Sequence, residues 1–119
     1  MARYELSCGE GRGEVRLWAE ATDETLVVML YNSAVHIGAV AVGEYDSAHD
    51  RASVSVVTRL GHKDDAVALR AAHTISKATH QPVCVVAGIH LDDITGAEID
   101  TLLVNAESVV AELLTCIRA

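Results

Sequence analysis

The sequence predicts an α+β fold: a two-layer sandwich in which a mostly antiparallel, mixed sheet of about six strands carries two helices, within one domain spanning residues 1–119. Two observations predict it. The first half of the chain holds five short segments that are rich in Val or alternate between apolar and polar residues, which is typical of strands. The second half holds two longer segments with apolar residues at three- and four-residue spacing, which is typical of helices, with one apolar run between them.

The strands come first in the chain. Strands are expected at residues 2–8, 14–20, 26–31, 36–43 and 53–58, each separated from the next by turn residues. The segment 26–31 is apolar at every position, which predicts a central strand covered on both faces. A helix over 64–79, a strand over 83–87 and a helix from 95 to about 117 then complete the sandwich.

The two helices carry recognisable signals at their starts and on their buried faces. Thr95 and Glu98 have the spacing of a capping box, and Asp64 can cap the earlier helix with its side chain. The earlier helix carries a narrow, mostly alanine stripe that allows close approach to a sheet, formed by Ala68, Ala72, Ile75 and Ala78. The second helix carries a wider apolar face, which could serve the sheet, a partner or both.

Composition and charge restrict the partners. A formal net charge of −8 argues against nucleic acid or an anionic membrane, so any anion must be bound locally. Three cysteines without a CxxC pair fit reduced thiols better than a disulfide framework, which favours a cytoplasmic protein. The N-terminus lacks the apolar run of a signal peptide, and no segment is long and apolar enough to span a membrane.

Two loops concentrate polar side chains, because each has a glycine after a strand and then His-x-Asp-Asp before a helix. They are GHKDD at 61–65 and GIHLDDIT at 88–95. Free backbone amides at helix starts favour anions, and Lys63 with the nearby Arg59 could add positive charge for a phosphate. The aspartates oppose this, so capping of two helices is the alternative. A divalent metal is a third interpretation, with His62, Asp64, His90 and Asp92 as its ligands.

A third polar segment, 32–38, precedes a strand of small residues. Its His36 is either a ligand contact or a histidine held in place by hydrogen bonds. The small residues of 37–43 could let another backbone come close, or could form a wall against which a flat ring packs. The sequence contains no nucleophile elbow, Walker loop or GxGxxG, which disfavours covalent catalysis and the usual nucleotide sites.

Three motifs in order resemble one family: HIGAVAVG at 36–43, GHKDD at 61–65 and GIHLDDIT at 88–95. From about Val15 to Leu114, the chain resembles the LpdD-like proteins, small partners of UbiD-type decarboxylases. The positions that match the family's motifs are His36, Gly38, His62, Lys63, Asp64, His90 and Asp92.

The resemblance implies a function without catalysis by this chain. It implies a homodimeric chaperone, similar in fold to proteasome assembly chaperones, that binds reduced prenylated FMN and helps to load it into an apo-decarboxylase. Trp18, Tyr31 and Tyr45 are the aromatic candidates for stacking on the flavin. Two alternatives stay open on the residues alone, namely a small metal-dependent hydrolase that uses the two His-x-Asp loops and a protein-assembly chaperone without a small ligand.

Overall fold

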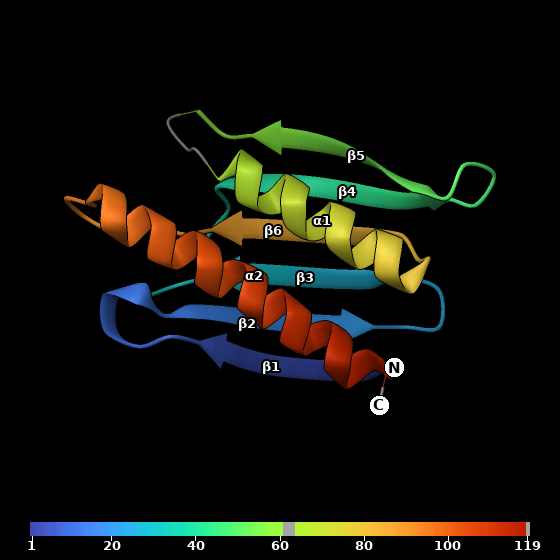
Figure 1. The fold of residues 1–119 in the computed structure, drawn as a ribbon, viewed down its shortest axis with the longest axis horizontal. Helices are drawn as coiled ribbons and strands as arrows, with labels where there is room; N and C mark the ends of the chain where they lie inside the picture. Colours follow the sequence, from blue (N-terminus) through green and yellow to red (C-terminus); the bar gives the residue numbers. More distant parts are fainter. Residues whose placement is uncertain (61–63, 119) are drawn as a thin grey trace.

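In the computed structural model, which describes residues 1–60 and 64–118, six strands form one mixed sheet and two helices pack against one of its faces (Figure 1). The predicted α+β class is thereby confirmed. The strands are β1 (Ala2–Cys8), β2 (Val15–Ala21), β3 (Leu26–Tyr31), β4 (Ala39–Asp46), β5 (Arg51–Thr58) and β6 (Val83–Gly88). The helices are α1 (Asp65–Thr79) and α2 (Gly96–Arg118), and a short 3-10 turn, η1 (Gly11–Gly13), joins β1 to β2.

The order of the strands places four connections at the same end of the sheet. The order is β1-β2-β3-β6-β4-β5, in which β3 and β6 are parallel and all other neighbours are antiparallel. Consequently, the β1–β2 turn, the β3–β4 segment, the end of β5 and the β6–α2 segment lie together, at the left of Figure 1. We call this the loop end of the sheet, and every described residue of the three motif loops lies at or beside it.

The core lies between the helices and the helix-facing side of the sheet, and small residues let α1 come close. A Cβ atom added to Gly43 on β4 would lie 2.6 Å from the carbonyl oxygen of Ala72 on α1, so only glycine fits there. The predicted alanine stripe is confirmed at Ala68, Ala72 and Ile75, which are fully buried, but Ala78 is exposed.

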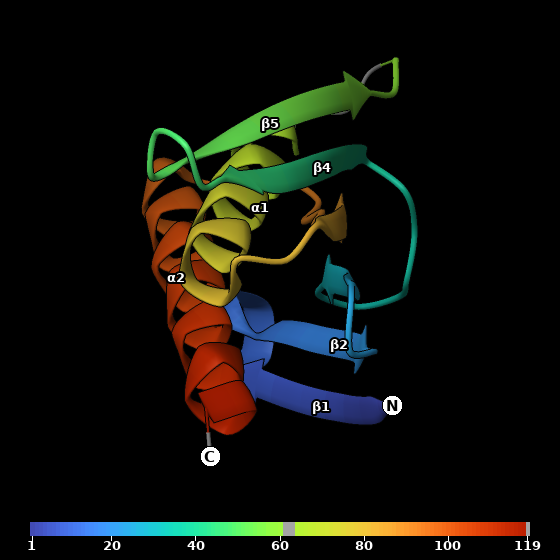
Figure 2. The same ribbon diagram turned by 90° about the vertical axis from the view of Figure 1, so that its right-hand side faces the viewer.

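The opposite side of the sheet carries no helix, as Figure 2 shows. We call it the open face. The prediction that the segment 26–31 is covered on both faces is wrong for the single chain, because Val27 is 42% exposed. The open face is largely apolar at its centre, and its side chains from β2, β3, β6 and β4 include Trp18, Val27, Met29, Tyr31, Cys84, Val86, Val40 and Val42.

The fourth strand differs most from its prediction, since it spans Ala39–Asp46 instead of 36–43. Its pairing with β6 and β5 begins at Ala39, and Tyr45 and Asp46 still pair with β5, so the turn is shorter than predicted. The small residues Ala39, Ala41 and Gly43 face α1. The predicted close approach of another backbone is therefore confirmed on this face, whereas the predicted ring-binding wall is wrong there, because α1 covers these residues.

Two further observations concern the chain as a whole. Among the described residues, no helix is long and apolar enough to cross a membrane. Cys8, Cys84 and Cys116 are all free thiols, which agrees with the prediction of unpaired cysteines.

Candidate ligand-binding site

The motif residues that the structure describes gather at the loop end, where the β3–β4 segment, the start of α1 and the β6–α2 segment meet. His36, Gly38, Asp64, His90 and Asp92 all lie there. His62 and Lys63 lie outside the described residues. The described parts of these three segments are therefore neighbours in space, which the sequence alone could not show. Specific side chains hold them together.

Asn32 joins the β3–β4 segment to the β6–α2 segment. It is buried, and its Nδ2 donates to the carbonyl oxygen of His90 at 2.6 Å, while the backbone N–H of His90 donates to its Oδ1 at 3.2 Å. The amide side chain thus joins the two chain segments just beyond the ends of β3 and β6. Asn32 was not predicted as a site residue, although its place directly after an apolar strand is a signal in the sequence.

Asp64 joins the start of α1 to both other segments. The backbone N–H of Ile89 donates to its Oδ1 at 3.4 Å, and Oδ2 lies where a Cβ atom on Gly38 would be, 1.8 Å from the built position. Asp64 stands at the N-cap of α1 but makes no side-chain capping hydrogen bond. The capping prediction for Asp64 is therefore wrong, because its nearly buried carboxylate points into the loops.

His36 lies against Gly88. A Cβ atom at Gly88 would come within 2.1 Å of the carbonyl oxygen of His36, so glycine is required for the segment to cross the end of β6. The ring Nδ1 of His36 is 3.0 Å from the carbonyl oxygen of Ala34. Gly88 pairs with Tyr31 on β3, and this brings an aromatic side chain of the open face beside the same segment.

The other two aromatic candidates lie elsewhere. Trp18 belongs to the middle of β2, and Tyr45 lies at the opposite end of the sheet, where its ring stacks on His80 with centroids 3.8 Å apart. Tyr31 is thus the aromatic candidate that reaches the loop end.

Arg59 brings a positive charge to this end. Its backbone N–H donates to the carbonyl oxygen of Gly38 at 3.1 Å, and its Nη1 donates to the carbonyl oxygen of Ile37 at 2.9 Å. The guanidinium is therefore held beside the segment that carries His36. This geometry suits an anionic group of a ligand, because guanidinium presents several donors in one plane.

His90 and Asp92 form a pair at the surface, with Nε2 of His90 3.0 Å from Oδ1 of Asp92. Both side chains are well exposed. Among the described residues, no three His, Cys, Asp or Glu side chains are arranged to hold a metal ion. The four-residue ligand set predicted for a metal includes His62, which lies outside the described residues.

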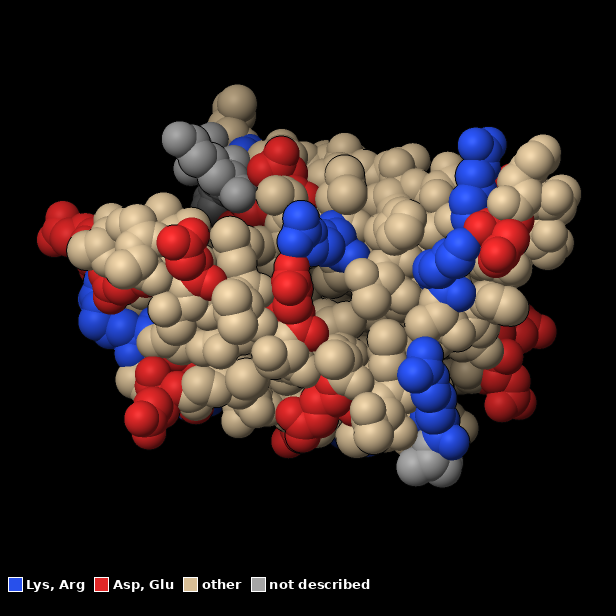
Figure 3. Space-filling model, viewed as in Figure 1, with Lys and Arg blue, Asp and Glu red and all other residues tan. Residues whose placement is uncertain are grey.

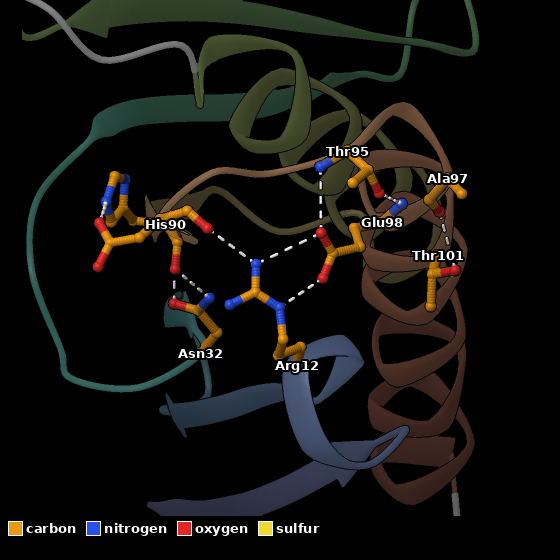
Figure 4. A network of polar contacts seen from close by, with 8 residues as sticks. Arg12, Asn32, His90, Thr95, Ala97, Glu98 and Thr101 are labelled. Atoms are coloured by element: carbon orange, nitrogen blue, oxygen red, sulfur yellow. Dashed lines mark hydrogen bonds and ion pairs between the residues drawn. The ribbon is translucent and has the colours of Figure 1, made fainter.

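A network around Arg12 fixes the outer part of the β6–α2 segment (Figure 4). Arg12, on η1, donates through Nε to Oε2 of Glu98 at 2.5 Å and through Nη2 to the carbonyl oxygen of Asp92 at 2.8 Å. Glu98 also forms the predicted capping box with Thr95, since each backbone N–H donates to the other's side chain at 3.1 Å. The Arg12 guanidinium, together with the backbone N–H of Thr95, lowers the pKa of Glu98 to about 2.

Acidic side chains surround the site. Asp65, Asp92, Asp93 and Asp100 are all exposed at this end of the molecule, and Figure 3 shows red side chains gathered at its left edge. Among the described residues, Arg59 and Arg12 are the cations in the four connecting segments, and Arg12 already pairs with Glu98. An anionic ligand would therefore be held by a local cationic corner within a negative surface.

A cavity between the two helices is separate from these polar residues. This cavity has a volume of about 350 Å³ and lies between α1 and α2, with Leu30 among its lining residues. Its walls are mostly aliphatic, and Arg70 and Glu107 form an ion pair beside it. Because it holds none of the motif residues, we place the candidate site at the loop end.

Comparison with known proteins assigns a family to this arrangement. A family model described as the prenylated flavin chaperone LpdD-like domain matches residues 9–118, which include all three motifs. A chain of a structure titled "Crystal Structure of a Novel Chaperone Complex for Yeast 20S Proteasome Assembly" is similar over 99% of this chain and 97% of that chain. The TM-score is 0.61 at 15% sequence identity, which confirms the predicted likeness of fold. No curated protein sequence matches the chain.

Proposed function

The chain belongs to the prenylated flavin chaperone LpdD-like family, and from this premise we propose that it is a non-catalytic carrier of reduced prenylated FMN. In this proposal, a single LpdD-like domain binds the cofactor in the cytoplasm and assists its insertion into an apo UbiD-type decarboxylase. The observation that carries the proposal is the convergence of the family's motif segments at one end of the sheet, held by Asn32 and Asp64.

The chemistry of the loop end supports a flavin phosphate ester as the ligand. Arg59 supplies a fixed cation for the phosphate, and His36 and His90 supply donors or acceptors for the polar edge of the ring system. Tyr31 supplies an aromatic surface beside them. Lys63, predicted to assist with the phosphate, stays a proposal because it lies outside the described residues.

Exposed apolar side chains around the same end support contact with the decarboxylase. Val35, Ile37, Leu60 and Ile94 lie in the connecting segments at the loop end, and each is at least 39% exposed. At the opposite end of the sheet, the β2–β3, β4–β5 and α1–β6 connections contain none of the large exposed hydrophobic residues of the described chain. The acidic residues at the loop end favour a client whose cofactor entrance is basic, because a site that binds a phosphate needs positive charge.

The open face supports the homodimer. Its central side chains on β3, β6 and β4 are apolar and carry no covering helix. A second copy that packs the same face against it would bury these side chains, in the manner of a two-sheet sandwich.

The direct test of the carrier function is an anaerobic titration of the purified protein with reduced prenylated FMN, beside oxidised FMN and a series with chelator. We expect saturable binding of the reduced prenylated cofactor and unchanged affinity with chelator. Absence of binding by the reduced cofactor would contradict the proposal, and loss of binding with chelator would place a metal in the site.

A matched pair of histidines tests the location of the site. His90→Ala is expected to weaken binding by roughly tenfold, the loss of one charge-assisted hydrogen bond. His49→Ala is the control, because His49 forms a similar pair with Asp46 at the opposite end of the sheet, with Nδ1 and Oδ2 2.8 Å apart. If the two variants bind the ligand with equal affinity, His90 is not part of the binding site.

A further inference from the structure

Arg12 connects the β1–β2 turn, which lies outside the three motifs, to the β6–α2 segment, which contains one of them. It lies on the η1 turn between β1 and β2, and its guanidinium reaches 80 residues along the chain to the carbonyl oxygen of Asp92 and 86 residues to Glu98. The turn beneath it is itself tied to α2, since Nδ2 of Asn105 donates to the carbonyl oxygen of Gly13 at 2.7 Å. The side chain of Arg12 therefore extends from a turn that is itself held in place (Figure 4).

The part of the β6–α2 segment that Arg12 contacts has few other hydrogen bonds, although the side chain of Leu91 packs against the core. Its start is held where the N–H groups of Ile89 and His90 donate to Asp64 and Asn32. Its end is held by the capping box of Thr95 and Glu98. Within the described part of the chain, no side chain other than Arg12 donates to the backbone of residues 91–94.

The guanidinium already donates to the carboxylate of Glu98 and to the carbonyl oxygen of Asp92, so it is not a free cation for a ligand. The hydrogen bond to Glu98 raises the pKa of Arg12, and Asp92 and Asp93 add to this effect. The role left for Arg12 is to hold its neighbours in place, because its planar guanidinium binds the Asp92 carbonyl oxygen and the Glu98 carboxylate at the same time.

We propose that Arg12 is a positioning residue, which fixes the segment that carries His90 and Asp92 against the β1–β2 turn and thereby sets how long the ligand is retained. The second half of this inference rests on the proposed carrier function. When the contact is lost, the segment moves more, so the ligand leaves faster. The route by which it binds is unchanged.

The variants separate this role from general stability. Arg12→Ala removes both contacts, and Glu98→Gln removes the charge of the partner while a glutamine still serves the capping box. Arg3→Ala is the matched control, because Arg3 pairs with Glu20 in the same way, with similar exposure of both side chains, at the opposite end of β1 and β2. Arg3 touches none of the motif segments.

The first readout needs no ligand. Amide hydrogen exchange of peptides covering residues 89–95 is expected to speed up in Arg12→Ala, to a smaller degree in Glu98→Gln, and to stay at the wild-type rate in Arg3→Ala. Equal exchange in Arg12→Ala and Arg3→Ala would overturn the positioning role.

The second readout is the dissociation rate of reduced prenylated FMN under anaerobic conditions. We expect the dissociation rate to increase roughly fivefold in Arg12→Ala, because one charge-assisted contact at the surface is lost. We expect no change in Arg3→Ala. Faster exchange with an unchanged dissociation rate would overturn the claim on retention. If the wild-type protein binds no ligand, the retention claim fails with the proposed function, and the exchange result still decides whether Arg12 fixes the segment.

Discussion

At the scale of single residues, Gly38 and Asp64 act as a sterically coupled pair. Oδ2 of Asp64 occupies the space in which any side chain on Gly38 would begin. We predict that Gly38→Ala destabilises the protein by about 1–3 kcal/mol, the usual cost of overpacking a filled site. Chemical denaturation of the two proteins measures this difference.

The control for Gly38 is Gly96→Ala, because a Cβ built at Gly96 would meet no atom within 4 Å outside the adjacent backbone. Its free energy of unfolding should change by less than about 1 kcal/mol. In the background of Asp64→Ala the cost of Gly38→Ala should shrink, since the obstructing oxygens are gone. An unchanged cost in that background would show that Asp64 is not the obstruction.

Glu98 gives a pH-dependent prediction at the same scale. Hydrogen bonds from Arg12 and from the backbone N–H of Thr95 lower its pKa from 4.5 to about 2, so the ionised form is favoured in the folded protein. Its contribution to stability is therefore complete above pH 4.5 and is lost as the pH falls through about 2. The difference in melting temperature between wild type and Glu98→Gln should be constant from pH 7 to 5 and should shrink below pH 4.5. A difference that does not depend on pH would contradict the Arg12 contact.

At the scale of elements, periodicity predicted the strands and helices because each has one face buried in the sheet-helix core. The sixth strand and both helices lie where their apolar spacing placed them, and the capping box of Thr95 and Glu98 is confirmed. The fourth strand was placed three residues too early, because the segment from His36 continues the apolar pattern of a strand although His36 crosses Gly88 as a loop.

The start of α2 tests the capping box as a stabilising element. Thr95→Ala should reduce the free energy of unfolding by about 1 kcal/mol, since the N–H of Glu98 loses its acceptor. Thr115→Ala, within the same helix, removes only a hydroxyl that donates to the carbonyl oxygen of Ala111. A loss as large at Thr115 as at Thr95 in thermal denaturation would refute a specific role for the cap.

At the scale of the whole molecule, the sequence predicted which loops carry polar side chains but not how they meet. Their convergence follows from the strand order, in which β6 inserts between β3 and β4. Pairing partners distant in the chain leave no mark in local periodicity. For the same reason Asn32 and Arg12 were not selected, because their contacts lie 58 and more residues away.

The open face gives the prediction that belongs to this scale. If two copies pack through it, Val86→Lys should produce a monomer, because a charge would be buried in an apolar interface. Val104→Lys, on the exposed side of α2, should leave the mass unchanged. Analytical ultracentrifugation over a range of concentrations measures both, and a Val86→Lys protein with the mass of the wild type would exclude this face as the interface.

The two ends of the described chain lie far from the candidate site. Met1 precedes β1 and Arg118 ends α2, and Figure 1 shows both ends of the ribbon at the right, opposite the four connecting segments. An affinity tag or a surface tether attached at either end therefore leaves the ligand-binding segments facing the solution. Immobilised protein should accept and release a ligand as the free protein does, so that its transfer to a client can be followed on a sensor surface.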